Sequence, residues 1–291
     1  MNKKDIVSKQ RMIKYQPDFL DNREIFTKEE TRFLEELCRK APLDKFLNNQ
    51  SYVEKFGFDF IYTSALIEGN TYDKLDTQAL IEYGRTAGGK KYSDAKMILN
   101  LRDAYGQIIS KELLPTKQTL KDLHYILSAE MVADAERATP RDKEVAITGC
   151  DYIPLSTKAR LDQELNHLFT ISEAIDNPFD QALYIHNNLA YLQYFTDCNK
   201  RTARVMLNVV LKQANCMIYI PDEEQVKAYL GAIVSYYETG DYSLFKAYFI
   251  HSYQKVVEMI EEAEKQLIAC LKTRILLTDT VHLIPGSLFP Y

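Results

Sequence analysis

The stretch QYFTDCNKRTAR, from Gln193 to Arg204, separates two apolar segments of the chain. One acid, one amide, one lysine and two arginines gather around its turn. The residues before it repeat apolar side chains at helical spacing, and the residues after it, 201–215, are apolar almost all round. A helix that is apolar on every side belongs in the interior of a protein. The sequence therefore predicts a buried helix-loop-helix with a strongly charged loop.

Helical patterns extend in both directions from this centre. Asn177 and Pro178 have the residue types of an N-cap and a first helical position, so they predict the start of the helix before the loop. Thr27 is a second expected N-cap. The other expected helices are 28–39, 58–68, 76–83, 94–109, 119–131, 158–169, 222–237 and 242–267. Ten glycines and nine prolines in 291 residues leave room for long helices.

Residues 144–154, EVAITGCDYIP, break the helical pattern. Two short β-prone pieces flank a turn that contains Gly149. This arrangement predicts a β-hairpin on an otherwise helical protein. A single hairpin leaves an edge that can pair with another chain.

Composition excludes several classes of protein. The chain is 46% hydrophobic and 26% charged with a net charge of −5, as in ordinary globular proteins, and it has no basic run that would indicate a nucleic-acid partner. No window approaches 18 apolar residues, and the basic N-terminus has no apolar stretch behind it, so we expect neither a membrane span nor a signal peptide. Five scattered cysteines without C-x-x-C spacing argue against a disulfide framework and a zinc cluster. We expect a cytoplasmic protein.

The charged loop has the chemistry of an anion site. The turn Thr196–Lys200 precedes a helix N-terminus, where unpaired backbone N–H groups and the positive end of the helix dipole attract phosphate. Arg201 and Arg204 add bidentate donors, and Asp197 is an oxygen ligand suited to Mg²⁺. These residues together indicate a nucleotide polyphosphate site. A polar connection with surface salt bridges would use the same residues, so both interpretations stay open on charge alone.

The loop resembles the signature of the Fic family, H-x-F-x-(D/E)-(G/A)-N-(G/K)-R-x-x-R. The matching residues are Phe195, Asp197, Asn199, Lys200, Arg201 and Arg204. Residues 64–70, SALIEGN, resemble the family's inhibitory motif (S/T)-x-x-x-E-(G/N), and residues 145–154 resemble the flap that borders the target site. Tyr242–Phe245 resembles the helix after the core, so the resemblance covers roughly residues 60–250.

The resemblance implies a mostly α fold: a Fic-type helical core with one β-hairpin flap and an N-terminal helical extension. It implies three parts: residues 1–115, which carry the inhibitory helix at about 60–70; a core over 116–250; and a C-terminal helix and tail over 251–291. Relatives transfer AMP from ATP to a protein hydroxyl, so ATP and Mg²⁺ are the implied ligands. Relatives often form dimers, so a homodimer is among the expected assemblies.

The same resemblance implies roles for single residues. Asp197 would hold Mg²⁺, the turn of Thr196, Cys198 and Asn199 would bind phosphates, and Arg204 would hold the terminal phosphate with support from Arg201. The flap residues Val145, Ala146, Ile147, Thr148 and Gly149 would bind an extended target protein by strand addition.

The loop departs from the family pattern in two places. Gln193 stands where the family has the histidine that accepts the target's proton, and an amide cannot act as a general base near pH 7. Such a loss typically reduces the rate by about 10²- to 10⁴-fold. Lys200 resembles the Doc branch, which transfers phosphate instead of AMP, and Cys198 fills the place of a small residue.

The motif around Glu68 implies inhibition. Gly69 can end the helix in a left-handed turn, which places Glu68 at a helix C-terminus where a nearby cation stabilises it. By resemblance that cation is Arg204, and Ser64 lies on the same helix face as Glu68. The leading hypothesis is an autoinhibited, ATP-binding AMP-transferase relative with weak or no activity. A Doc-like phosphotransferase and a non-catalytic partner-binding protein are the alternatives.

Overall fold

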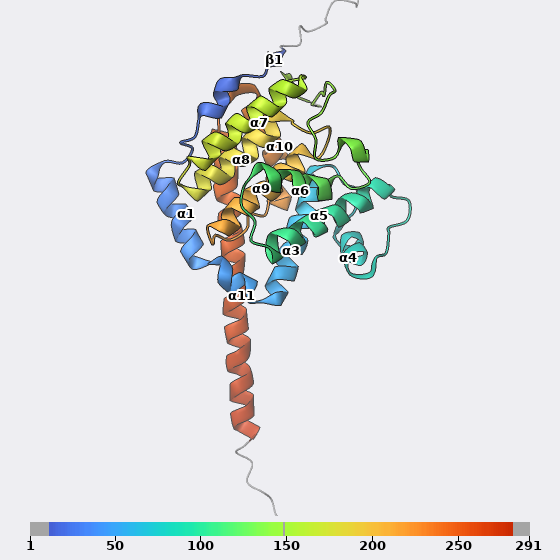
Figure 1. The fold of residues 1–291 in the computed structure, drawn as a ribbon. Helices are drawn as coiled ribbons and strands as arrows, with labels where there is room; N and C mark the ends of the chain where they lie inside the picture. The colour runs from blue at the N-terminus through green and yellow to red at the C-terminus, as the bar shows by residue number, and fades with distance from the viewer. Residues whose placement is uncertain (1–11, 148, 282–291) are drawn as a thin grey trace, which may run out of the picture.

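The computed structural model describes residues 12–147 and 149–281, and its elements are helices except for two short strands (Figure 1). The helices are α1 (Lys28–Lys40), α2 (Leu43–Leu47), α3 (Gln50–Ile67), α4 (Lys74–Tyr83), α5 (Tyr92–Ser110), α6 (Lys117–Leu127), α7 (Lys158–Glu173), α8 (Pro178–Leu192), α9 (Asn199–Gln213), α10 (Val226–Thr239) and α11 (Ser243–Val281). Three 3₁₀ turns accompany them: η1 (Pro17–Asp21), η2 (Asp134–Glu136) and η3 (Glu223–Gln225). The predicted mostly helical fold is confirmed.

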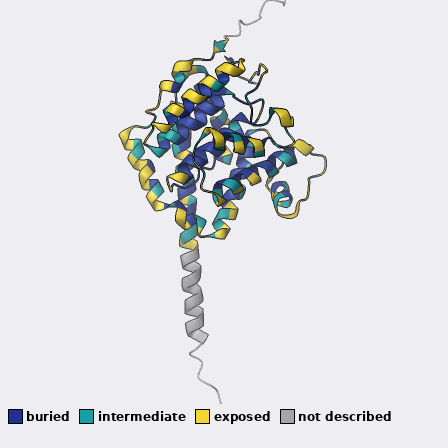
Figure 2. Ribbon diagram, in the orientation of Figure 1, coloured by how far each residue is buried: buried dark blue, intermediate teal, exposed yellow. Residues whose placement is uncertain are grey.

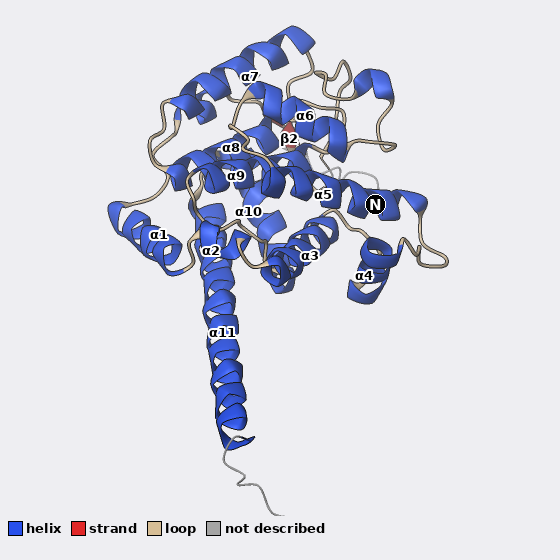
Figure 3. Ribbon diagram, turned by 60° about the horizontal axis from the view of Figure 1, so that its bottom comes forward, coloured by secondary structure: helices blue, strands red, loops and turns tan. Residues whose placement is uncertain are grey.

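Helices α8 and α9 form the centre of the molecule. They pack against each other, and α3, α5, α6, α7 and α10 surround them (Figures 1 and 3). Nearly every residue of both central helices is buried, as the dark ribbon in Figure 2 shows. This burial is the physical reason for the all-round apolar sequence of α9.

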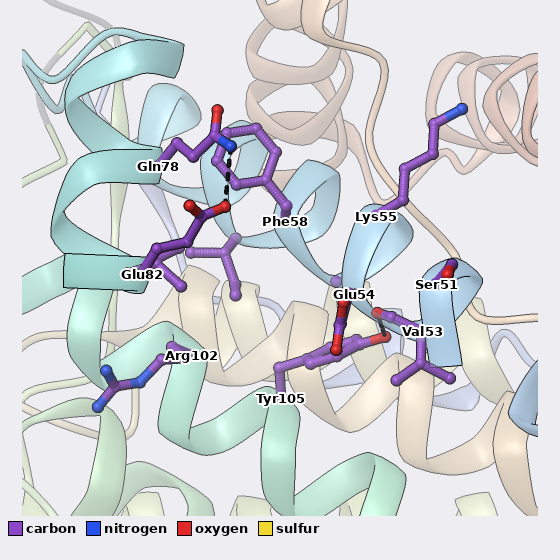
Figure 4. A pocket seen from close by; sticks show the side chains of 12 residues that line it. Ser51, Val53, Glu54, Lys55, Phe58, Gln78, Glu82, Arg102 and Tyr105 are labelled. Atoms are coloured by element: carbon purple, nitrogen blue, oxygen red, sulfur yellow. Dashed lines mark hydrogen bonds between the residues drawn. The ribbon is translucent and has the colours of Figure 1, made fainter. Parts of the chain in front are cut away.

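Helix α11 runs from the core to a long projecting end (Figure 1). None of the helices in the described part of the chain combines the length and the apolar character needed to cross a membrane. A cavity of about 630 Å³ lies between α3, α4 and α5, with Tyr105, Phe58 and Arg102 among its lining side chains (Figure 4). No residue of the charged loop lines this cavity.

The predicted helix caps and the predicted end of α3 are present in the structure. Thr27 forms a reciprocal capping box with Glu30, and the Asn177 side chain accepts hydrogen bonds from Phe179 N and Asp180 N. Gly69 has φ +77°, and Asn70 N donates to Ala65 O at 3.1 Å, so α3 ends in the predicted left-handed turn.

The predicted β-hairpin over 144–154 is wrong within the described residues. The only strand there is β2 (Tyr152–Ile153), and it pairs in parallel with β1 (Ile13–Lys14). Tyr15 and Tyr152 both stack on the ring of Tyr191 in α8, at centroid distances of 4.9 and 4.5 Å. These two aromatic contacts bring the N-terminal segment beside β2, so a distant strand takes the place of the expected local partner.

Candidate nucleotide site at the N-terminus of α9

The charged loop is a sharp turn between α8 and α9. Gln193 ends α8 with φ +48°, and Cys198 precedes α9 with φ +63°. The Asn199 side chain accepts from Phe195 N at 2.9 Å and donates to Phe195 O at 2.8 Å. One buried amide thus closes the turn, and the first N–H groups of α9 stay at a helix N-terminus, as an anion site requires.

His124 of α6 packs against the turn, a contact that the sequence analysis missed. Its ring stacks on Phe195 at 3.6 Å between centroids, and Nε2 lies 3.2 Å from Asp197 O. Ala138 N donates to Nδ1 at 3.0 Å, so the ring proton belongs on Nε2, which donates to Asp197 O. Burial lowers the pKa of His124 to about 4, so the ring stays neutral at pH 7. His124 holds the loop and has no free nitrogen with which to accept a proton.

Arg141 is a second supporting residue that the sequence analysis missed. The side chain is buried and donates from Nε to Gln193 O at 2.6 Å. Its other nitrogens donate to the carbonyls of Lys143 and Leu155. A guanidinium bound to three carbonyls ties the charged loop to both ends of the 144–154 segment. A lone arginine in a loop offers no local pattern that predicts this role.

The end of α3 lies against α9 and brings Glu68 to Arg204. The two side chains form an ion pair with a distance of 2.7 Å between Oε1 and Nη2, and Lys200 Nζ lies 3.3 Å from Oε2. Arg204 also donates to Ser64 O at 3.1 Å. The Ser64 hydroxyl is buried and has no partner among the described residues, so Ser64 contributes its carbonyl here.

The pair determines the charge state of Glu68. Burial would raise the pKa of this carboxyl, but Arg204, Lys200 and Arg201 outweigh that effect and hold the pKa at about 2. Glu68 is therefore ionised throughout the neutral range and neutralises the guanidinium that would otherwise face an anion.

The opposite side of Arg204 meets a buried hydrogen-bond chain. Arg204 Nη1 donates to Tyr229 Oη at 3.1 Å, and that hydroxyl lies 2.9 Å from His186 Nε2. His186 Nδ1 lies 2.8 Å from Asn187 Oδ1. Burial lowers the pKa of His186 to about 3, so the ring is neutral and accepts from Tyr229. This chain orients Arg204 and gives His186 a packing role.

Asp197 is the exposed acid of the loop. Its carboxylate accepts from Cys198 N at 2.5 Å and lies 3.3 Å from Nη2 of the buried Arg201. Among the described residues, no group of three or more His, Cys, Asp or Glu side chains could hold a metal alone. One exposed carboxylate beside the N-terminus of α9 nevertheless has the donor chemistry that Mg²⁺ takes, since this ion is bound by one or two carboxylates and completes its shell with phosphate oxygens and water.

Gln193 and Cys198 serve the shape of the turn. Gln193 Nε2 donates to Ala190 O at 2.7 Å, and Gln193 Oε1 accepts from Asn199 Nδ2 at 3.3 Å. Cys198 is buried, and burial raises its pKa to about 12, so its thiol fills space and is not reactive.

The residues predicted to form the flap line a cavity to which the charged loop contributes no residue. Val145, Ala146, Ile147 and Gly149 line an open cavity of about 800 Å³ together with Met12 and Ser156. Thr148 lies outside the described residues. Arg141 connects this segment to Gln193, so flap and loop share one buried anchor.

Comparison with known proteins identifies the central part of the chain. The Fic/DOC family profile matches residues 114–211, which span α6 to α9. Residues 114–211 are a Fic/DOC family domain. The domain thus includes the charged loop, His124 and Arg141, whereas Glu68 lies before it and Tyr229 after it.

Relatives and solved structures agree with the Fic/DOC assignment. The chain is 27% identical over 162 residues to the protein adenylyltransferase Fic of Nematostella vectensis, which covers 54% of this chain and 38% of that protein. It is 24% identical over 229 residues to the protein adenylyltransferase fic-1 of Caenorhabditis briggsae, with 74% and 42% covered. The chain therefore spans less than half the length of these curated relatives. A Fic family protein from Desulfovibrio desulfuricans G20 has the same fold, with a TM-score of 0.69 at 16% identity over 86% of this chain and 78% of that one.

Proposed function

We propose that the chain binds ATP at the N-terminus of α9 and transfers AMP to a protein hydroxyl at a low rate, and that Glu68 holds the site inactive. The Glu68–Arg204 pair carries this proposal. The guanidinium is buried, so a phosphate can reach it only if it displaces a carboxylate that already neutralises it. The names of the curated relatives support the choice of ATP and AMP.

Each loop residue has a proposed part in nucleotide binding. Backbone N–H groups of the turn Thr196–Lys200 bind phosphate oxygens, as helix N-termini do, except that of Cys198, which donates to Asp197 Oδ1. Asp197 holds Mg²⁺, which neutralises phosphate charge. Arg204 binds the terminal phosphate once Glu68 has left, and Arg201 keeps Asp197 in place through their 3.3 Å contact.

The low rate follows from Gln193. Its amide is engaged by Ala190 and Asn199, and it cannot accept a proton from a target hydroxyl near pH 7. His124 and His186 have both ring nitrogens engaged, so neither replaces the missing base. The target would lie along Val145–Ile147, beside the cavity that these residues line.

Calorimetric titration with ATP tests the site. Glu68→Gly should tighten ATP binding relative to wild type, because it frees Arg204 and removes a negative charge from the place of the terminal phosphate. Arg204→Ala in the Glu68→Gly background should weaken binding by more than about 1 kcal/mol, because a hydrogen bond to a charged group is worth about 1.5–3 kcal/mol. Lys111→Ala, outside the site, is the control. Equal affinity in all variants would refute the nucleotide site.

Transfer of the terminal phosphate is the second candidate function. Lys200 favours this reaction. Its ammonium lies 3.3 Å from Glu68 Oε2, so it would change the orientation of a nucleotide bound beside the loop. The double variant Gln193→His with Glu68→Gly restores a base, and histidine tolerates the left-handed backbone at this position. Label from the α-phosphorus of ATP on protein supports AMP transfer, and label from the γ-phosphorus supports phosphate transfer. Firm ATP binding without either label would favour a non-catalytic binding protein.

A further inference from the structure

Two cysteines far apart in the sequence meet beside the far end of α9. Cys38 lies in the last turns of α1, and Cys216 lies just after α9 ends. Their sulfur atoms are 2.9 Å apart, and both thiols are free. The contact joins residues 178 positions apart, so it is a product of the tertiary fold.

The surroundings distinguish the two thiols. Cys38 is half-buried and can be reached from solvent, whereas Cys216 is buried. In the reduced pair Cys38 Sγ donates to Cys216 Sγ. Once Cys38 has lost its proton, the Cys216 thiol donates to the Cys38 thiolate, so the contact lowers the pKa of Cys38 and raises that of Cys216. Cys38 is therefore the nucleophile that an oxidant meets first, and Cys216 is placed to resolve the product.

We propose that Cys38 and Cys216 form an oxidation site that a small disulfide such as oxidised glutathione converts to an intramolecular disulfide. The Cys38 thiolate attacks one sulfur of oxidised glutathione, which releases one glutathione thiolate and leaves a mixed disulfide. Cys216 loses its proton and attacks the Cys38 sulfur of that mixed disulfide, and the second glutathione leaves. One disulfide is reduced to two glutathione thiols, and two protein thiols are oxidised to one disulfide.

The bond would link α1 to the segment that follows α9. Leu43 N already donates to Asn215 O at 3.4 Å, so the chain after α1 lies beside this segment in the reduced protein. A disulfide that closes so long a loop restricts the unfolded chain strongly. The oxidised protein should therefore unfold at a higher temperature than the reduced protein.

Incubation of the purified protein with oxidised glutathione, followed by thiol counting in denaturant, tests the site. Wild type should lose two thiols and carry no glutathione. A tryptic digest without reductant should contain peptide 33–39 linked to peptide 213–227. The melting temperature of the oxidised protein should rise by roughly 5–15 °C over the reduced one.

Variants separate this site from ordinary thiol oxidation. Cys38→Ala and Cys216→Ala should each form no internal disulfide and show no rise in melting temperature. Cys150→Ser is the matched control, because Cys150 is also half-buried and lies beside Glu238, and it should behave as wild type. A stable glutathione adduct on Cys38 with Cys216 still free, a link to another cysteine, or an unchanged melting temperature would overturn the proposal.

Discussion

Arg141 bonds to the loop at residues 193–204 and to Lys143 and Leu155, which flank the segment at residues 144–154, but the loop and the segment are stabilised in different ways. The loop is closed by its own residues, since Asn199 bonds to both backbone groups of Phe195 within the same turn. The 144–154 segment takes its strand partner from Ile13–Lys14, more than a hundred residues away. A motif whose hydrogen bonds are local specifies its own shape, whereas a two-residue strand takes whichever partner the tertiary fold provides.

The first test removes the Glu68–Arg204 ion pair, which joins α9 to the end of α3. Arg204→Met keeps the volume but leaves Glu68 with Lys200 alone, so we expect a loss of about 3–5 kcal/mol in the free energy of unfolding, as for other broken buried pairs. Urea denaturation measures it. Adding Glu68→Gln should recover part of the loss, and Arg102→Met, at a partly exposed arginine that pairs with its neighbour Asp103, should change little. A loss below 1 kcal/mol would mean that the loop needs no support from α3.

The second test uses pH to weaken the same contact. The pKa of Glu68 is about 2, below its ordinary value of 4.5, so its ionised form stabilises the folded state. That stabilisation, about 3 kcal/mol, is complete above pH 4.5 and disappears as the pH falls toward 2. Urea denaturation from pH 6 to 2.5 should show a smaller loss of stability in Glu68→Gln than in wild type. Parallel curves for the two proteins would contradict the pairing.

The third test breaks the loop from within. Asn199→Ala leaves the N–H and C=O of Phe195 buried without their partner, so we expect a loss of about 2 kcal/mol in the free energy of unfolding. The exposed Asn48 is the matched control, and Asn48→Ala should cost less than about 0.5 kcal/mol. Equal effects at the two asparagines would show that the turn is held by packing.

The smallest effect is expected at the strand pair. Ile13→Pro removes the N–H that donates to Asp151 O at 3.0 Å, so the loss in the free energy of unfolding should be about 1 kcal/mol. Hydrogen exchange should accelerate at residues 151–153 and stay unchanged at residues 195–204. Faster exchange in both segments would show that Arg141 couples the loop to the 144–154 segment.

The sequence by itself determined the features whose causes lie within a few residues. Asn177 caps α8, Gly69 ends α3, and the all-round apolar pattern places α9 in the interior, each by interactions within one or two helical turns. The motif resemblance also singled out Glu68 and Arg204 together, although no local pattern joins residues 136 apart.

Only the tertiary structure decided which distant groups meet. Arg141 bonds to Gln193, His124 stacks on Phe195, and Cys38 touches Cys216 because helices far apart in the chain bury their apolar faces together. The β1–β2 pair follows from the same cause, since two tyrosines stack on one ring of α8. Helix capping and the hydrogen bonds within a tight turn act over a few residues, so they can be recognised from the sequence. Burial acts over the whole molecule, and its contacts appear only when the complete core is assembled.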